Sequence, residues 1–266
     1  MNAWHSTQIR RSPASRARGF TLVELMVTVG IAVFLLFGLV TIVENVRLSY
    51  ANQQGLAQLQ DEQRFVMTVI TDVVQNGGYL PNQIPLNYVP STSFPASGAY
   101  ASVPAGSAFA GAHTSATAPD TLHVRYLVGP NDNSIQCDGS QSNGATTLYD
   151  NAFTVVQQAV TATKPTAGYL TCTLNGGAAI NIATGVQNLQ VYYGVNRNNP
   201  GGDYNIDTYL TADQMKPADW TYISSVMVIV SFTNPLFGQA GMTAASNQTI
   251  SFLRVIPVMA RVGMHS

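Results

Sequence analysis

The sequence Arg18-Gly19-Phe20-Thr21-Leu22-Val23-Glu24-Leu25-Met26-Val27 opens an apolar run that continues to Val43. No charged side chain lies between Glu24 and Glu44. These 19 uncharged positions predict a helix about 28 Å long at the standard helical rise, which is close to the thickness of the bilayer core. We therefore expect a membrane-spanning helix with a single carboxylate, that of Glu24, at its N-terminal end.

The flanking charges predict how this helix is oriented. The first 19 residues contain four arginines and no acid: Arg10, Arg11, Arg16 and Arg18. Arginines directly before a hydrophobic segment keep that end in the cytoplasm, so the rest of the chain is exported. The apolar run is longer than that of a secretory signal peptide, and no Ala-x-Ala-like site follows it. Ordinary signal cleavage is therefore not expected, whereas an uncleaved signal anchor fits the hydrophobicity.

The segment from Gly19 to Val27 also closely resembles the prepilin signal of type IV pilins and type II secretion pseudopilins. In that family a membrane peptidase cuts on the cytoplasmic side after the glycine, methylates the new N-terminal phenylalanine and leaves the apolar segment in place. The resemblance implies cleavage after Gly19, methylation of Phe20, and Glu24 as the fifth residue of the mature chain. It also implies an inner-membrane precursor with its head in the periplasm, and later a place in a pilus fibre.

Glu24 needs a partner because a carboxylate in lipid is costly and indicates a function. Cleavage would create an α-amino group at Phe20, and the Glu24 carboxylate of one subunit could pair with that amine on a neighbour. Such pairing offsets part of both desolvation costs. We interpret Glu24 as a residue that sets the register of assembly; the simpler alternative is that its side chain extends to the lipid headgroups.

Beyond Asn45 the apolar side chains recur in steps of three and four, which predicts an amphipathic helix. They are Val46, Tyr50, Leu56, Leu59, Val66, Ile70, Val73 and Val74. Asn76-Gly77-Gly78 supplies a helix stop. We therefore divide the chain into a basic leader (1–19), a helix (20–77, with a membrane part 20–43 and an amphipathic part 44–77) and a β-rich head (78–266).

Two further segments resemble the PilW group of minor pilins. One is Leu56-Ala57-Gln58-Leu59-Gln60-Asp61-Glu62-Gln63-Arg64-Phe65, followed by Gly77-Gly78-Tyr79; the other is Val186-Gln187-Asn188-Leu189-Gln190-Val191, which leads to Tyr193-Gly194-Val195. The resemblance implies helix packing with other major and minor pilins, and contacts with the prepilin peptidase, the inner membrane and the pilus assembly platform.

The head is expected to form an antiparallel sheet. Alternating apolar residues predict strands at 120–128, 153–157, 168–174, 183–195, 220–232 and 248–262. The most apolar of these, 220–232, is expected in the middle of the sheet against the helix. The last is expected at an edge or to contain a bulge, because Pro257 interrupts it. Segment 81–119, rich in Pro, Ser, Ala and Gly, predicts a long surface loop.

Cys137 and Cys172 are the two cysteines, and in an exported domain the default is one disulfide. In the chain-entropy model it would contribute roughly 3–4 kcal/mol. Zinc binding is a poor alternative because neither a second cysteine pair nor a histidine lies at zinc-site spacing.

Little else in the sequence indicates chemistry. In 196–207, Asp203, Asn205 and Asp207 alternate like calcium ligands, but no bidentate glutamate follows, so a turn is the better interpretation. His123 is expected to be a solvated or hydrogen-bonded side chain. The charged fraction of 9% is low and typical of an exported β-rich protein rather than a cytosolic enzyme. No nucleophile elbow, P-loop or dinucleotide motif occurs, so no catalysis, cofactor, metal or nucleic acid is expected.

These observations predict an α+β protein whose long N-terminal helix packs on an antiparallel β-sheet domain, as in pilins. The predicted function is that of a minor pilin that primes or joins a bacterial type IV pilus. One alternative is a minor pseudopilin of type II secretion, similar to the GspJ group. Another is an uncleaved, signal-anchored periplasmic binding domain that never polymerises.

Overall fold

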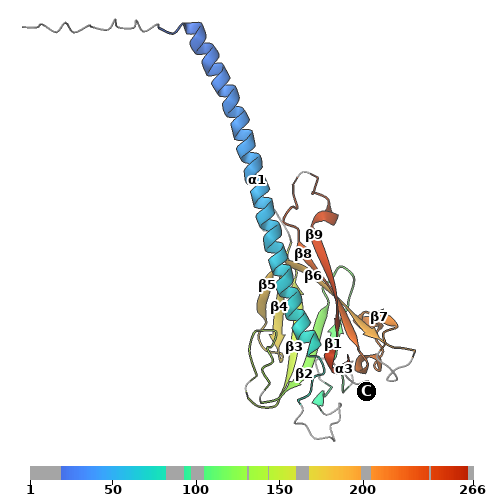
Figure 1. Ribbon diagram of the computed structural model, residues 1–266. Helices are drawn as coiled ribbons and strands as arrows, with labels where there is room; N and C mark the ends of the chain where they lie inside the picture. Colours follow the sequence, from blue (N-terminus) through green and yellow to red (C-terminus); the bar gives the residue numbers. More distant parts are fainter. Residues whose placement is uncertain are drawn as a thin grey trace, which may run out of the picture. The chain divides into compact units, whose positions relative to one another are not determined.

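The computed structural model describes residues 19–81, 93–96, 105–130, 132–142, 144–159, 168–198, 205–239 and 241–262. The elements follow one another from one long helix to a series of antiparallel strands (Figure 1). They are α1 (Leu22–Gln75), β1 (Phe109–Ala112), β2 (Thr121–Val128), β3 (Thr147–Val156), β4 (Tyr169–Leu174), β5 (Ile180–Thr184), β6 (Val186–Val195), β7 (Thr208–Leu210), η2 (Ala212–Gln214), η3 (Asp219–Thr221), β8 (Ser225–Thr233), η4 (Ala245–Asn247), β9 (Thr249–Pro257) and α3 (Met259–Val262).

The chain divides into two compact units, Met1–Ala51 and Asn52–Ser266. In the first unit every described residue is exposed. The second unit contains the rest of α1 together with all the strands and has one hydrophobic core. The predicted α+β class, a long helix followed by an antiparallel β domain, is confirmed.

Within the second unit, one face of α1 enters the core. Its buried residues are Leu59, Val66, Met67, Ile70, Val73 and Val74, whose spacing places them along one face of the helix, as in an amphipathic helix. The helix ends at Gln75, and two glycines follow for different reasons. A Cβ at Gly77 would lie 2.3 Å from the Phe109 ring, while Gly78 has a φ of +77°, a conformation that glycine adopts without strain.

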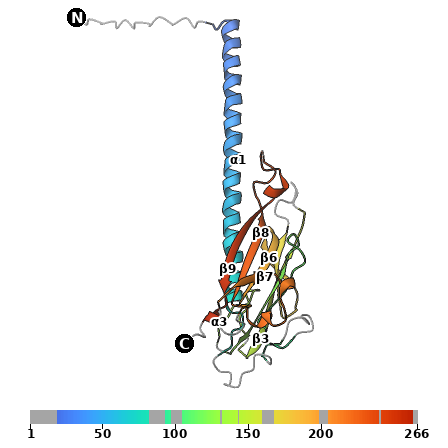
Figure 2. The same cartoon turned by 90° about the vertical axis from the view of Figure 1, so that its right-hand side faces the viewer.

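The head consists of two sheets rather than the one that was expected. Their strand orders are β1-β2-β3-β4-β5 and β7-β6-β8-β9, and every pairing is antiparallel. Figure 2 shows β6, β8 and β9 side by side. Strand β6 contacts β2, β3 and β4 of the other sheet, so the two sheets share the core.

The strands with strong alternation are where the sequence predicts them. In β2 the side chains of Leu122, Val124, Tyr126 and Val128 are fully buried. Strand β8 is central in its sheet, and β9 is its edge strand. The start of the predicted strand 220–232 is wrong, because Trp220 lies in the short helix η3 and its ring packs on Tyr193 at a centroid distance of 5.0 Å.

The interpretation of 81–119 as a surface loop is wrong for 107–112, whereas 113–119 is an irregular and largely exposed loop. Strand β1 pairs with β2, and Phe109 and Ala110 are buried. Arg125, only 2% exposed, donates to the carbonyl oxygens of Pro95, at 2.7 Å, and of Ser107. A four-residue strand with the sequence Phe-Ala-Gly-Ala has too little alternation to be predicted. Most of the stretch before residue 105 lies outside the described residues.

The predicted strand 183–195 is two strands in different sheets. Strand β5 ends at Thr184 and β6 begins at Val186. Between them, Gly185 has a φ of +75°, so the chain changes sheet at a single glycine. A bulge between Val186 and Asn188 then lets both Val186 and Leu189 face the core.

Asp120 joins the two sheets at the start of β2. Its backbone N–H donates to the Leu189 carbonyl (2.7 Å), and its Oδ2 accepts from the Val191 N–H (2.8 Å). Its Oδ1 lies 2.8 Å from Nδ1 of His113. Burial raises the pKa of this carboxyl, and the bonds from Val191 and His113 act in the opposite direction. Asp120 therefore positions β6 on the first sheet.

Candidate processing and assembly site

The N-terminus of α1 is built by Thr21. Its Oγ1 accepts from the Glu24 N–H at 3.2 Å, and its carbonyl accepts from the Leu25 N–H at 3.1 Å. Thr21 is thus the N-cap, and Thr21 with Glu24 has the spacing of a capping box. A carboxylate in the first turn also interacts favourably with the helix dipole. The helix thus begins within the prepilin-like segment, two residues after the predicted start at Phe20. The capping role of Thr21 was not predicted from the sequence.

Gly19 and Phe20 precede the helix and are exposed, Phe20 by 79%. A Cβ added to Gly19 would meet no atom within 4 Å. No contact with a described residue therefore requires glycine at this position. A requirement for glycine would have to come from another molecule that acts on the Gly19–Phe20 bond.

The apolar part of α1 satisfies its own polar groups. Thr28 donates to the Glu24 carbonyl (2.9 Å), and Thr41 donates to those of Phe37 (3.2 Å) and Gly38 (2.8 Å). Among the described helices, α1 is the one long and apolar enough to cross a membrane. The Glu24 carboxylate forms no hydrogen bond or ion pair with any described residue. It is the one charged group of Leu22 to Val43, and within the described chain it lacks a partner.

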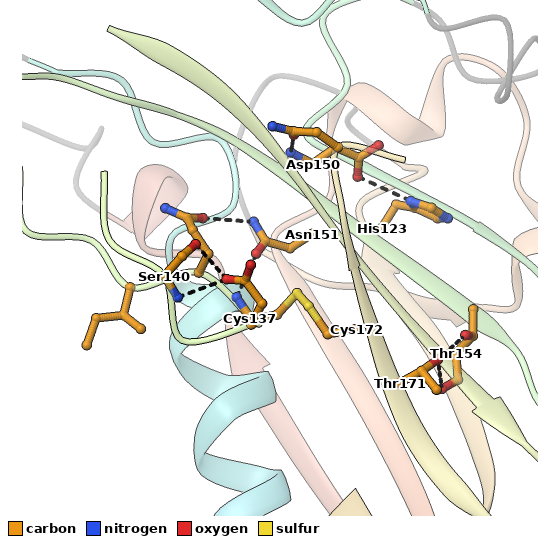
Figure 3. The surroundings of a disulfide bond; sticks show 12 residues. His123, Cys137, Ser140, Asp150, Asn151, Thr154, Thr171 and Cys172 are labelled. Carbon is orange, nitrogen blue, oxygen red and sulfur yellow. Dashed lines mark hydrogen bonds and ion pairs between the residues drawn. A yellow bond between two sulfur atoms is a disulfide. The ribbon is translucent and has the colours of Figure 1, made fainter. Parts of the chain in front are cut away.

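The predicted disulfide is present and joins the segment between β2 and β3 to β4 (Figure 3). The Cα atoms of Cys137 and Cys172 are 5.9 Å apart, within the usual range. The Cys137 N–H donates to Oδ1 of the buried Asn151 at 2.8 Å. Asn151 Nδ2 and the Tyr126 hydroxyl both donate to Oε1 of Gln136, at 3.2 and 2.7 Å. The disulfide therefore lies beside a buried hydrogen-bond network.

The two described histidines each contact an aspartate. His123 Nδ1 lies 3.2 Å from Asp150 Oδ1 (Figure 3), so the predicted hydrogen bond is present, although the side chain is largely buried. His113 contacts Asp120, as described above. No group of three or more histidine, cysteine or acidic residues that could hold a metal occurs in the described part of the chain.

The segment 196–207 is held by its last aspartate. The Asp207 carboxylate accepts from the N–H groups of Arg197 (3.0 Å) and Asn198 (2.9 Å). Arg197 in turn donates to Asp219 Oδ2 at 2.6 Å, which also accepts from the Lys216 N–H. Asp203 lies outside the described residues, so the calcium-like alternation of Asp203, Asn205 and Asp207 is not placed. The contacts of Asp207 link the described residues on either side of 199–204.

Asp219 is expected to make the stability of the head depend on pH. Burial acts to raise the pKa of its carboxyl, but hydrogen bonds from Arg197 and Lys216, together with their charges, hold the pKa below its usual value. Such a group stabilises the fold above the unfolded pKa, about 3.9, and this contribution is lost as the pH falls through the folded pKa. We expect Asp219→Asn to lower the free energy of unfolding by about 1–2 kcal/mol near pH 7 and by progressively less below about pH 4.

Thermal unfolding as a function of pH measures this effect. Asp61→Asn, at an exposed position of α1, is the matched control and should match the wild type throughout. If Asp219→Asn lowers the melting temperature equally at neutral and at acid pH, the charge of the Asp219 carboxylate is not the cause of the destabilisation.

Comparisons with known proteins agree with this arrangement at both ends of the chain. A family model described as prokaryotic N-terminal methylation motif matches residues 14–40, and one described as Type IV Pilus-assembly protein W (PilW) matches residues 140–249. Curated protein sequences give no match. Among solved structures, the type IV-like pilin TTHA1219 from Thermus thermophilus aligns at 12% identity and a TM-score of 0.34, over 75% of this chain and 95% of that one. The methylation motif at the start of α1 and the PilW match over residues 140–249 of the head support a type IV minor pilin with a prepilin signal.

Proposed function

We propose that the chain is cut between Gly19 and Phe20 and then primes or joins a type IV pilus by packing α1 against the helices of other pilins. In this assembly the Glu24 carboxylate pairs with the new amine of Phe20 on a neighbouring subunit. The observation that carries the proposal is that Glu24 has no partner among the described residues, in a segment whose other polar side chains, Thr28 and Thr41, are satisfied.

The energetics favour a partner supplied by another subunit. A lone carboxylate in lipid costs several kcal/mol, and the α-amino group of a cut chain would carry a similar cost. Pairing them offsets part of both costs. The uncut chain has no such amine at Phe20, so the pairing would couple assembly to processing.

Two glycines in α1 fit close packing between helices. Gly30 and Gly38 each cost about 1 kcal/mol of helix stability relative to alanine. A Cβ at either position would meet no atom of this chain within 4 Å. Small residues allow helix backbones to approach closely in a membrane, which would give these glycines a role in an assembled bundle.

The charges before α1 support one orientation of the precursor. Four arginines precede Gly19, and by the positive-inside rule the leader then lies in the cytoplasm and the head in the periplasm. The peptidase would act on the cytoplasmic side, and the assembly platform would collect the mature subunit from the inner membrane. The part played by the chain is structural.

The test is Glu24→Gln, which removes the charge and keeps the shape. We expect normal membrane insertion, but incorporation into pili reduced at least tenfold. Breaking a buried charge pair costs roughly 2–5 kcal/mol, and about 1.4 kcal/mol already corresponds to tenfold. Immunoblots of sheared pili and of membranes give the ratio of incorporated to membrane-bound protein for the variant and the wild type.

Glu44→Gln is the matched control, because Glu44 is the acid at the other end of the same apolar segment. It should enter pili at the wild-type level. Wild-type incorporation of Glu24→Gln would remove the pairing from the proposal.

A further inference from the structure

The described residues that line one cleft of the head include no ionisable side chain. The cleft has a volume of about 570 Å³ and lies among the end of β3, the start of β6, the end of β8 and the start of β9. Its polar lining includes Gln157, Gln158, Asn188, Ser231, Gln248 and Thr249. We refer to it as the amide cleft.

The chemistry of this lining selects a class of ligand. A carboxamide presents two donor hydrogens and an acceptor oxygen, and a hydroxyl both donates and accepts. A phosphate, a carboxylate or a metal ion would find no opposite charge among the described lining residues, and burying an unpaired charge is expensive. A sugar suits the cleft because each of its hydroxyls also donates and accepts and the molecule carries no charge.

Part of the lining is held in place before any ligand binds. Gln157 Nε2 donates to the carbonyls of Thr117 (3.2 Å) and Gln187 (3.0 Å). Asn188 Nδ2 donates to the Ala116 carbonyl, and its Oδ1 accepts from Gln190 Nε2, both at 3.3 Å. These bonds orient the Gln157 and Asn188 amides, which lowers the entropy cost of using their remaining hydrogen-bonding capacity.

Two other amides remain available. The side chains of Gln158 and Gln248 form no hydrogen bond with any described residue. They belong to separate elements, one after β3 and one before β9, so they can bind a ligand from two directions. Neither side chain supports the fold through such a bond, which makes both suitable for substitution.

Size and surroundings also fit a sugar. The volume falls within the range of small-molecule sites, about 300–1,000 Å³, and would hold about two sugar rings. The sheet face that carries Asn188 and Ser231 continues with the paired residues Ile229 and Leu253. Leu253 is 60% exposed, so this apolar surface could cover the C–H face of a ring that extends from the cleft.

We propose that the amide cleft binds a neutral saccharide of about two rings. This binding is independent of the assembly proposed above, because it uses the head and none of the residues at the start of α1. The two proposals can therefore fail separately.

The test uses the full chain in an amine-oxide detergent, since detergents with sugar headgroups would occupy the site. Calorimetric titrations are made with maltose, cellobiose, lactose and N,N′-diacetylchitobiose. At least one should bind with a dissociation constant of about 1 mM or lower. Gln158→Ala and Gln248→Ala should each weaken that binding by roughly 3- to 10-fold, since each removes a hydrogen bond to the ligand.

Gln141→Ala is the matched control, an exposed glutamine outside the cleft, and should bind like the wild type. A methyl glycoside of the best disaccharide distinguishes two possible natural ligands. If the glycoside binds as tightly as the free disaccharide, the ligand is the end of a longer glycan. If the glycoside does not bind, the ligand is a free sugar. The proposal is overturned if none of the four disaccharides binds up to about 10 mM, tenfold above the expected constant. It is also overturned if both cleft variants bind as tightly as the wild type.

Discussion

Gly19→Val should leave the chain with its leader attached. The expected site of cleavage is the bond between Gly19 and Phe20, and a branched side chain beside that bond would obstruct a peptidase that requires glycine. Without the cut there is no amine at Phe20 for Glu24 to pair with, so we expect the variant in the membrane and at least tenfold depleted from pili. Mass spectrometry of the purified chain detects the retained residues 1–19 and the absence of methylation.

The structure makes this result specific to processing. A Cβ at Gly19 meets no atom within 4 Å, so the substitution should not disturb the fold. Gly30→Val, also at a position without neighbours within 4 Å, is the matched control and should be cut normally. Removal of the leader from Gly19→Val at the wild-type rate would contradict the assignment of the cleavage site.

The second large effect is expected from the disulfide. Replacing Cys137 and Cys172 together with alanine removes a link between residues 35 positions apart. In the chain-entropy model, a loop of that length corresponds to about 4 kcal/mol. For a head of this size we therefore expect the melting temperature to fall by roughly 8–16 °C. Alanine is preferred to serine because both cysteines are buried, and a buried hydroxyl without a partner would add its own cost.

A reductant provides the control for this experiment. Dithiothreitol should lower the melting temperature of the wild type toward that of the double variant and should leave the variant unchanged. A variant that melts with the wild type would show that the network around Asn151 holds the segment without the covalent link.

The sequence predicts the parts of this protein that depend on local pattern. The uncharged, mostly apolar run from Leu25 to Val43 predicts a membrane helix, because in lipid the backbone N–H and C=O groups must bond to one another. The amphipathic repeat that follows predicts the helix that enters the core. Alternation in β2 and β8 predicts buried strands in the same way. The α+β class, the disulfide and the pilin resemblance all follow from residues that are close together in the chain or few in number.

Predictions fail where a contact between distant residues decides the structure. Arg125 looks like a surface residue of a strand, yet it is buried because its guanidinium binds carbonyls of the segment before β1. Asp120 has an ordinary position before a strand, yet it joins the two sheets through Val191. Neither partner lies near enough in sequence to leave a periodic signal.

The sequence by itself thus determined the α+β class and the match to a prepilin signal, and it predicts the roles of Gly19, Phe20 and Glu24, because hydrophobic period and a short peptidase motif are local properties of a chain. Only the tertiary structure decided the split into two sheets at Gly185, the burial of β1 and the amide cleft. Each of these depends on which distant side chains meet, and that is set by packing and hydrogen-bond satisfaction over the whole head.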